Sequence, residues 1–596
     1  MSSVHAARVL LQALADRGLR EVVLAPGSRS APLAYAVAEA ARRDGDRDPA
    51  APRLDVHVRI DERDAGFLAV GLARGAALAG RARPVAVVTT SGTAVANLHP
   101  AVLEAHHAGL PLLLLTADRP HELRGTGANQ TTEQVGLLEP VRLTLDVPAP
   151  TGRPGEDRDL RHLAVRAVAA ALGLRTEDPG PVHVNLAFRE PLVPDGAPWP
   201  EPSDAGLTEV LRRGAPAGDL AVAAEVADGV PTVVVAGDGA GPTARRLAEA
   251  NGWPLLAEPS SGARGGPCAI PAYRLLLGEA DLGGAVRRVV VLGRPTLSRP
   301  VQALLGRADV ESLVIAPTGR EWVDAPRAAS RVATEVPPAL LAGAGPAGAA
   351  ERAWLARWQE AGRVALAAIA AALDEVALDE AGLTSAPPDA TRRPAPALTG
   401  PAVARAVARA CGEDDVLVVG SSNPVRDLDL VADWSQPPQV VANRGLAGID
   451  GTLATAAGVA LALDRPVRAY VGDLTFLHDI GGLLVGPLER APELQVVVAN
   501  DDGGSIFATL EHGEPERADV FERVFGTPHG ADLGALCAGY GVEHTRVTDL
   551  AALAAALAGP VRGRSVVEVV VDRSRRRELT AAVAAAVRSA LGARSS

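Results

Sequence analysis

Two aspartates follow two strongly apolar stretches in the last third of the chain. Asp473 comes directly after "VRAYVG", and Asp501 comes directly after "LQVVVAN", 28 residues later. Both stretches are typical of strands that are buried on both faces of a parallel sheet. Neighbouring parallel strands end at one edge of the sheet, and open α/β sheets bind their ligands at that edge. We therefore expect both carboxylates at one edge, with a single crossover helix over 478–492 between the strands.

The turn that follows the second strand reads Asn-Asp-Asp-Gly-Gly over 500–504. Its backbone carbonyls add neutral oxygen ligands to the carboxylates of Asp473 and Asp501. Oxygen ligands of this kind suit Mg²⁺, which proteins often bind together with a phosphate group. Either motif alone is more often an ordinary loop, whereas the two motifs together predict a metal site.

A third carboxylate, near the amino terminus, could carry out proton chemistry. Glu62 lies in "VRIDERDAGFLAVGLARG", just after an expected strand and just before a helix rich in glycine and alanine. Taken alone, such a residue is more often a surface carboxylate of a helix. Considered with the metal pattern, Glu62 becomes the leading candidate for an acid–base group.

Composition narrows the class of protein. The chain has 596 residues, of which 47% are hydrophobic and 22% charged, so we expect several folded domains. A net charge of −12 argues against nucleic-acid binding, which needs a basic surface. No apolar run is long enough to insert into a membrane, and the first residues predict an amphipathic helix. We expect a cytoplasmic protein.

The absence of lysine excludes three further classes, because every one of the 59 basic residues is an arginine. A Walker A phosphate loop needs a lysine, and so do pyridoxal-phosphate enzymes and Schiff-base aldolases.

The three cysteines are far apart and form no CxxC pair, and the histidines form no metal-binding motif. A cysteine- or histidine-bound metal is therefore not expected.

The elements that must position these residues follow a repeated strand–helix pattern. Apolar runs that predict strands occur in three groups, at 21–28, 85–92, 111–118 and 181–188; at 232–239, 288–295 and 312–319; and at 415–422, 467–474, 494–501 and 565–572. Proline-rich stretches at 189–206 and 384–400 separate the groups, and a helix is expected near 350–376. The pattern predicts an α/β protein with doubly wound parallel sheets.

The spacing Gly-Asp…Asn-Asp-x-Gly resembles the diphosphate–magnesium signature of thiamine-diphosphate enzymes, whose usual form is GDG…NN. Leu474 stands where that signature has glycine, and Asp501 stands where it has the second asparagine. Seven further stretches resemble the 2-succinyl-5-enolpyruvyl-6-hydroxy-3-cyclohexene-1-carboxylate synthase family of menaquinone biosynthesis. They are "APGSRSAPL", "DERDAGF", "TTSGTAVANLHPAVLEA", "LTADRPHELRGTGANQTTEQ", "GSSNPVRDLDL", "NRGLAGIDGTLATAAG" and "NDDGGSIF".

This resemblance implies three doubly wound domains. They are a pyrimidine-binding domain over 1–190, a middle domain over 207–345 and a diphosphate- and metal-binding domain over 400–596, with a helix and linker over 346–399. It also implies a homodimer or homotetramer, in which the glutamate domain of one subunit faces the metal domain of another. The implied reaction decarboxylates 2-oxoglutarate and adds the remaining succinyl-semialdehyde unit to isochorismate by conjugate addition.

The resemblance also implies roles for individual residues. Glu62 would hydrogen-bond the aminopyrimidine ring of thiamine diphosphate and activate the cofactor. Mg²⁺, with Mn²⁺ as an alternative, would be held by Asp473, Asp501 and the carbonyl of Gly503. Further cofactor contacts would come from Gly472, Leu474, Gly504, Ile506 and Phe507.

Both implied substrates carry two carboxylates, so their pocket needs fixed cations, and guanidinium groups bind carboxylates bidentately. Each arginine alone is more often a surface charge, and only its place in a family motif makes it a candidate. For Arg299 the motif is "GRPTLSRP" at 293–300, where the middle domain resembles the family. The predicted substrate-binding residues are Ser28, Arg29, Arg119, Gln130, Arg299, Ser422, Arg426 and Arg444.

Two alternatives remain open from the sequence. One keeps the cofactor but acts on a simple 2-oxo acid, as a decarboxylase or an acetolactate-type synthase, although pyruvate would need fewer cations. The other is a nucleotide- or flavin-binding regulator that uses the glycine turn of "VVVAGDGAGPTARRLAEA". That turn has GxGxG spacing instead of GxGxxG, which favours a structural role.

Overall fold

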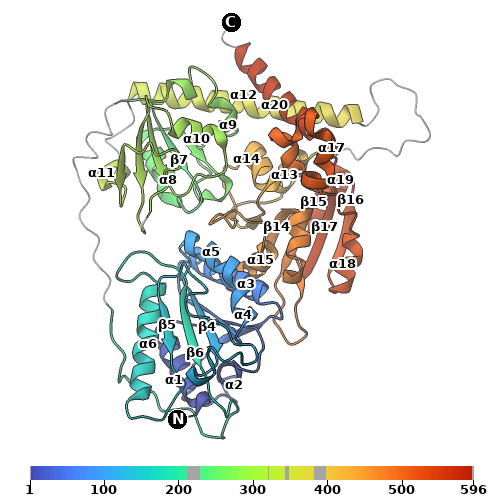
Figure 1. Cartoon of the computed structure of the whole chain (residues 1–596). Helices are drawn as coiled ribbons and strands as arrows, with labels where there is room; N and C mark the ends of the chain where they lie inside the picture. The colour runs from blue at the N-terminus through green and yellow to red at the C-terminus, as the bar shows by residue number, and fades with distance from the viewer. Residues whose placement is uncertain (1, 211–228, 320, 343–347, 381–397, 594–596) are drawn as a thin grey trace. The chain divides into compact units, whose positions relative to one another are not determined.

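The computed structural model describes residues 2–210, 229–319, 321–342, 348–380 and 398–593. Within these residues the chain forms three parallel sheets of six, five and six strands, with helices between most successive strands (Figure 1). This architecture confirms the predicted α/β fold class. None of the described helices combines the length and the apolar character that a membrane span needs.

The first sheet has the strand order β2-β1-β3-β4-β6-β5. Its strands are β1 (Glu21–Leu24), β2 (Asp55–Val58), β3 (Val85–Thr89), β4 (Leu112–Asp118), β5 (Thr144–Val147) and β6 (Val182–Ala187). Its helices are α1 (Ser3–Asp16), α2 (Ala31–Ala40), α3 (Glu62–Leu78), α4 (Thr93–Ala96), α5 (His99–Ala108) and α6 (Glu156–Ala171). The predicted amphipathic amino-terminal helix and the strand before Glu62 are both present.

The second sheet has the order β11-β10-β9-β7-β8. Its strands are β7 (Thr232–Ala236), β8 (Leu255–Ala257), β9 (Arg288–Leu292), β10 (Glu311–Ile315) and β11 (Arg331–Ala333), and its helices include α8 (Pro242–Asn251), α9 (Tyr273–Leu276), α10 (Arg299–Leu305) and α11 (Pro338–Ala342). The glycine turn before α8 serves chain packing. A Cβ atom on Gly237 would lie 2.0 Å from the carbonyl carbon of Arg294, so only glycine allows the two backbones to approach.

The third sheet has the order β13-β12-β14-β15-β17-β16. Its strands are β12 (Val416–Val419), β13 (Gln439–Val441), β14 (Val467–Gly472), β15 (Leu494–Asn500), β16 (Glu543–Val547) and β17 (Arg564–Val570). The helices of this part are α12 (Ala349–Glu380), α13 (Gly400–Arg409), α14 (Asn423–Val431), α15 (Thr452–Leu463), α16 (Asp473–His478), α17 (Ala518–Phe521), α18 (Leu533–Gly539), α19 (Leu550–Ala558) and α20 (Arg576–Gly592).

Strands β14 and β15 are neighbours, as expected, but their connection differs from the prediction. The structure has the short helix α16 and a 3-10 turn at Ile480–Leu483 in place of one helix over 478–492. The Gly481-Gly482 pair and Pro487 account for the difference, because both residue types disfavour a continuous helix.

The chain divides into two compact units. Unit 1 comprises residues 1–215, 443–467 and 478–494, and unit 2 comprises 216–442, 468–477 and 495–596. The predicted helix near 350–376 is confirmed by α12, whereas most of the proline-rich linker lies outside the described residues. The boundaries of the three-domain division stay a prediction.

Within unit 1, helices α3 and α15 pack at very close range. A Cβ atom on Gly71 would lie 2.1 Å from the carbonyl oxygen of Thr455, and one on Gly458 would lie 2.3 Å from the carbonyl oxygen of Leu68. Glycine at both positions therefore lets the helix backbones touch. Because α3 begins with Glu62, this contact fixes the helix that carries the candidate acid–base residue.

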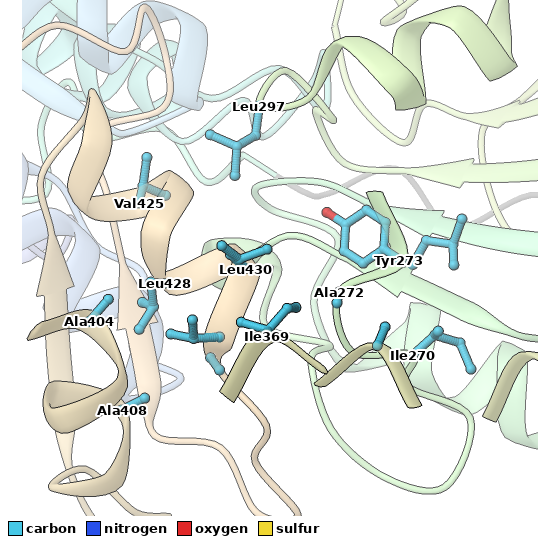
Figure 2. Packing of buried hydrophobic residues seen from close by; sticks show 14 of the residues in the cluster. Ile270, Ala272, Tyr273, Leu297, Ile369, Ala404, Ala408, Val425, Leu428 and Leu430 are labelled. Carbon is cyan, nitrogen blue, oxygen red and sulfur yellow. The ribbon is translucent and has the colours of Figure 1, made fainter. Parts of the chain in front are cut away.

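Within unit 2, one hydrophobic core joins the second and third sheets (Figure 2). Buried residues from α9 and its preceding loop, such as Ile270 and Tyr273, pack in the same core as Ile369 of α12 and Leu428 and Leu430 of α14. Arg264 reinforces the junction with a buried ion pair to Asp429 of α14, at 2.8 Å. Both the shared apolar core and the ion pair with Arg264 therefore hold helix α14 in place.

The close approach of α3 and α15 leads to a first prediction. Gly458→Ala places a methyl group against the backbone of α3, so we expect it to lower the free energy of unfolding by about 1–3 kcal/mol. Urea denaturation followed by circular dichroism measures the change. Gly45→Ala is the control, because a Cβ atom there meets nothing within 4 Å, and we expect it to change stability by less than about 0.5 kcal/mol. Equal stabilities of the two variants would contradict the prediction.

Candidate active site

The predicted metal site lies entirely in unit 2, at the carboxyl ends of β14 and β15. Asp473 is the first residue of α16 and only 2% exposed. Its Oδ1 accepts the N–H of Leu474 at 2.7 Å, and its Oδ2 accepts the N–H of Gly503 at 2.8 Å. The structure thus brings Asp473 and the turn after β15 together, as the spacing predicts.

The two aspartates act on each other electrostatically. Burial, together with the charge of Asp473, raises the pKa of Asp501 to about 7. Burial also raises the pKa of Asp473, which His529 and the two N–H donors partly oppose. A divalent cation between the two carboxylates would remove their repulsion, and carboxylate and carbonyl oxygens are the ligands that Mg²⁺ prefers. The residues present therefore fit such an ion.

The described residues contain no group of three or more His, Cys, Asp or Glu side chains arranged around a common metal position. The two aspartates would therefore need ligands of another kind, such as the carbonyl of Gly503. Gly503 has a φ of 145°, and a Cβ atom there would lie 2.0 Å from the carbonyl oxygen of Gly526. Gly504 donates its N–H to that same oxygen at 2.7 Å, which fixes the turn.

The residues predicted to surround the cofactor flank this turn. Gly472 ends β14, and Ile506 and Phe507 lie in a 3-10 turn, Ser505–Thr509, directly after the two glycines. The ring of Phe507 packs against Phe525, with 5.7 Å between the ring centroids. Both Ile506 and Phe507 are half-buried, so part of each side chain faces away from the core.

The start of α14 adjoins the same turn. Asn423, its first residue, donates from Nδ2 to the Ser505 hydroxyl at 2.7 Å, and that hydroxyl donates to Asp501. Ser422, which has a φ of 71°, precedes the helix, and its carbonyl accepts from Arg426 Nη1 at 2.8 Å. The amino terminus of α14 thus lies beside the turn that carries Asp501, and a helix amino terminus favours a bound anion.

Arg299, the remaining predicted residue of unit 2, lies at the start of α10. Its side chain is 77% exposed and forms an ion pair with Glu511 at 3.1 Å. Glu511 follows the 3-10 turn that contains Phe507. Arg299 is therefore tied to the segment that follows the turn of the predicted metal site.

The other predicted residues lie in unit 1. Glu62 is half-buried in the first turn of α3, which Asp61 caps by accepting the N–H of Arg63. Oε2 of Glu62 accepts a hydrogen bond from Asn97 Nδ2 at 3.3 Å. The carboxylate is thus placed at a helix amino terminus, where negative charge is favoured.

Two predicted arginines of unit 1 lie close enough to influence each other. Arg119 is 9% exposed, and burial followed by the positive charge of Arg29 lowers its pKa. Arg29 donates to the Phe188 carbonyl at 3.0 Å and lies 3.6 Å from Glu190. Two neighbouring guanidinium groups attract negative charge, so a substrate carboxylate could bind between them.

The loops around these arginines hold the remaining predicted residues. Ser28 is exposed beside Arg29, and Gln130 has a φ of 58° and donates from Nε2 to the Ser91 carbonyl at 2.9 Å. Arg444 is 4% exposed, in a loop that Glu104 fixes by accepting the N–H groups of Gly445 and Leu446. The predicted residues therefore form one set in each unit.

Sequence reasoning missed a pair of buried carboxyl groups next to Glu62. Asp64 of α3 is hydrogen-bonded to Asp479, which accepts the N–H groups of Leu453 and Ala454 at the start of α15. Burial, followed by the charge of Asp61, raises the pKa of Asp64 to about 6, and burial raises that of Asp479 well above its usual value. The pair therefore shares a proton and joins the beginnings of α3 and α15.

His529 is a second residue that sequence reasoning missed. Its Nε2 lies 3.1 Å from Oδ2 of Asp473, and its backbone N–H donates to Asp502 at 3.0 Å. The ring orients a carboxylate of the predicted metal site, as residues behind metal ligands commonly do. No spacing rule in the sequence links positions 473 and 529, so only the fold shows their contact.

Residues 4–137 match the thiamine pyrophosphate enzyme N-terminal TPP binding domain, and residues 423–571 match the corresponding C-terminal TPP binding domain. A 2-succinyl-5-enolpyruvyl-6-hydroxy-3-cyclohexene-1-carboxylate synthase of Kineococcus radiotolerans is 52% identical, with 99% of each chain covered. One of Nocardioides sp. is 48% identical, with 97% of each covered.

The chain belongs to the 2-succinyl-5-enolpyruvyl-6-hydroxy-3-cyclohexene-1-carboxylate synthase family. Membership in this synthase family, with the two matched domains, confirms the predicted thiamine-diphosphate enzyme. A benzoylformate decarboxylase structure from Polynucleobacter necessarius, at 18% identity and a TM-score of 0.64, covers 96% of this chain and 99% of its own. That similarity supports the fold alone.

The shared proton of Asp64 and Asp479 predicts how stability depends on pH. Because the folded-state pKa of Asp64 is about 6 and the unfolded value is near 3.8, the unfolded chain loses its proton first as pH rises. The stabilisation present below about pH 4 should therefore be lost by about pH 6, a change of about 1–3 kcal/mol. Asp64→Asn should reduce this loss in urea unfolding measured from pH 4 to 7.

Asp46→Asn is the matched control, because Asp46 is exposed on the same unit. We expect this variant to keep the pH dependence of the unaltered protein. If Asp64→Asn shows the same dependence as well, the carboxyl pair does not share a proton as described.

Proposed function

We propose that the protein decarboxylates 2-oxoglutarate and adds the succinyl-semialdehyde unit to isochorismate by conjugate addition. The product is the cyclohexene carboxylate that names the family, formed in menaquinone biosynthesis. The observation that carries the proposal is the paired carboxylate site of Asp473 and Asp501 in a chain of this family. The arginine-rich set in unit 1 supports substrates with several carboxylates.

Mg²⁺ would be held by Asp473, Asp501 and the carbonyl of Gly503, and Mn²⁺ would suit the same oxygen ligands. The diphosphate of the cofactor would complete the coordination of the ion. The amino terminus of α14, reached through the Asn423–Ser505 hydrogen bond, would supply N–H groups to phosphate oxygens. Gly472, Leu474, Gly504, Ile506 and Phe507 would form the remaining contacts.

Bound thiamine diphosphate supplies the electron sink that decarboxylation of a 2-oxo acid requires. The chain contributes Glu62, whose carboxyl group would share a proton with a ring nitrogen of the aminopyrimidine. The group is half-buried at the start of α3 and accepts a hydrogen bond from Asn97 at 3.3 Å. Glu62 would thus act as the acid–base residue of the reaction.

The arginines would bind and orient the two acids. Arg29 and Arg119 form a cationic pair in unit 1, together with Ser28 and Gln130, and Arg444 is buried in the same unit. In unit 2, Ser422, Arg426 and Arg299 would supply further donors. Fixed bidentate contacts convert the encounter of two substrates into an oriented reaction.

Assembly and location belong to the same proposal. We expect a homodimer or homotetramer in the cytoplasm, in which Glu62 of one chain acts with the metal site of another. The family resemblance supports this arrangement. This arrangement also determines which dimers of two different variant chains could be active.

The reaction itself provides the first test. The purified protein with both substrates should release CO₂ and consume isochorismate only when thiamine diphosphate and Mg²⁺ are present. Glu62→Gln should lower kcat at least 100-fold, because the side chain can no longer exchange a proton. Glu201→Gln, an exposed glutamate of the same unit, is the control and should keep full activity. Normal turnover by Glu62→Gln would contradict the assigned role.

Mixing two inactive variants tests the assembly. Chains with Glu62→Gln and chains with Asp473→Ala should each be inactive alone. After subunit exchange, half of the dimers are mixed, and one of the two sites in each mixed dimer has both residues intact. Activity should therefore recover to about one quarter of the unaltered level. No recovery after confirmed exchange would indicate that each site is built from one chain.

The contact between His529 and Asp473 predicts an effect on cofactor binding. His529→Ala should weaken the binding of Mg²⁺ with thiamine diphosphate about 10- to 100-fold, because Asp473 loses the group that orients it. Isothermal titration calorimetry measures the change. His121→Ala is the control, because His121 is exposed and lies in unit 1. Unchanged affinity for the His529 variant would show that the contact does not serve the site.

A further inference from the structure

A buried polar network in unit 1 leads to Arg119 from a residue that no motif includes. Its centre is Asn185, which is fully buried in the middle of β6. Strands β4 and β5 flank β6, and the register places Thr116 on one side of Asn185 and Asp146 on the other. A polar side chain at such a position is costly unless all its hydrogen-bonding groups are satisfied.

All four hydrogen-bonding positions of the Asn185 amide are used. Its Nδ2 donates to Asp118 at 2.8 Å and to Asp146 at 2.9 Å. Its Oδ1 accepts from Gln134 Nε2 at 2.8 Å and from the Thr116 hydroxyl at 3.2 Å. An amide offers two donors and two acceptor lone pairs, so this arrangement fixes the orientation of the group completely.

One route from Asn185 to Arg119 runs through Asp118. The Oδ2 atom of Asp118 accepts from Asn185, and its Oδ1 atom accepts the backbone N–H of Arg119 at 2.7 Å. Asp118 ends β4 and is 1% exposed. Asn185 therefore orients the carboxylate that holds the backbone of Arg119, together with Arg124, which lies 3.0 Å from the same oxygen.

A second route runs through Gln134 and reaches the guanidinium group. Oε1 of Gln134 accepts the N–H of Gly92 at 2.9 Å, which positions the turn after β3. The neighbouring Ser91 accepts from Arg119 Nη1 at 2.8 Å and donates to the Gln130 carbonyl at 2.9 Å. Gly92 itself has a φ of 81°, and a Cβ atom there would lie 2.9 Å from the Gln130 side chain.

We propose that Asn185 is a positioning residue for the substrate-carboxylate site, acting through Asp118 and Gln134 on Arg119 and Gln130. The inference rests on the proposed function, because it takes Arg119 and Gln130 as substrate contacts. Both routes end at the carboxyl edge of the sheet, where ligands of open α/β folds bind. A network that served stability alone would not need to hold one arginine at both its backbone and its guanidinium group.

The proposal predicts a specific kinetic change. Asn185→Ala should raise KM for at least one of 2-oxoglutarate and isochorismate by about ten-fold or more, with kcat within about three-fold of the unaltered enzyme. Loss of a contact that binds the substrate and the transition state equally produces this pattern. Gln134→Met removes only the second route while conserving length, and should change KM in the same direction.

Glu21→Gln is the structural control. Glu21 is buried in β1, where it accepts from His57 at 3.0 Å and Arg83 at 3.3 Å, and it has no connection to Arg119 through these contacts. We expect a lower Tm for this variant but KM values within two-fold of the unaltered enzyme. Calorimetric titration of the cofactor-loaded enzyme with 2-oxoglutarate provides a second readout that does not depend on isochorismate turnover.

The outcomes separate the two proposals. If the unaltered enzyme does not turn over the two acids, the proposed function fails. If it does, but Asn185→Ala and Gln134→Met lower Tm and leave both KM values within two-fold, the network is structural and the inference is overturned. Should Asn185→Ala not fold, Gln134→Met alone decides between these results.

Discussion

The repulsion between two buried carboxylates at one sheet edge is the constraint on which the rest of the structure depends. Asp473 and Asp501 follow adjacent strands, and burial with mutual repulsion raises the pKa of Asp501 to about 7. A protein that evolved only for stability would not gather like charges there. Around them, the Gly503 N–H, the Ser505 hydroxyl and the His529 ring hold the carboxylates in place. A cation at this edge would relieve the repulsion between the two carboxylates.

In unit 1 as well, buried partners hold the polar groups of the candidate site in place. Glu62 begins a helix whose first turn is tied to α15 through the proton shared by Asp64 and Asp479. The guanidinium group of Arg119 donates to the Ser91 hydroxyl, its backbone N–H donates to Asp118, and Asn185 supports that carboxylate from the adjacent strand. In both cases, the side chain expected to meet a ligand is positioned by a second residue that is buried more deeply. Such support reduces the entropy that must be lost when a ligand binds.

Helix α14 provides a comparable link in unit 2. Its amino terminus adjoins the turn of the predicted metal site, and its residue Arg426 is a predicted substrate contact. The ion pair of Asp429 with Arg264 holds its far end. The apolar residues of α14 share one core with α9 and α12 (Figure 2). The middle sheet therefore has a mechanical role in supporting α14, and its glycine turn serves the close approach of Gly237 to the Arg294 backbone.

The apolar runs in the sequence predicted the central strands of the sheets but not the strands at the edges. Each of the central strands, such as β4 and β15, appeared in the sequence as a continuous apolar run, because both of its faces are covered. Six strands lie outside the predicted apolar runs, and all of them lie at sheet edges: β2, β5, β8, β11, β13 and β16. Those at the two ends of the third sheet, "QVV" and "EHTRV", are short or polar, since an edge strand needs less apolar burial. The expected crossover helix over 478–492 failed because glycine and proline interrupt that segment.

The sequence by itself determined the α/β fold class, the pairing of Asp473 with the 500–504 turn, and the candidate Glu62. These depend on residue type, on short spacing and on apolar periodicity, all of which can be read along the chain. Only the tertiary structure placed His529 beside Asp473, Asp479 beside Asp64 and Asn185 behind Arg119. These contacts join residues that are tens to hundreds of positions apart, and no local pattern encodes them. Burial decided them, because a polar group removed from water must find a partner wherever the fold brings one within reach.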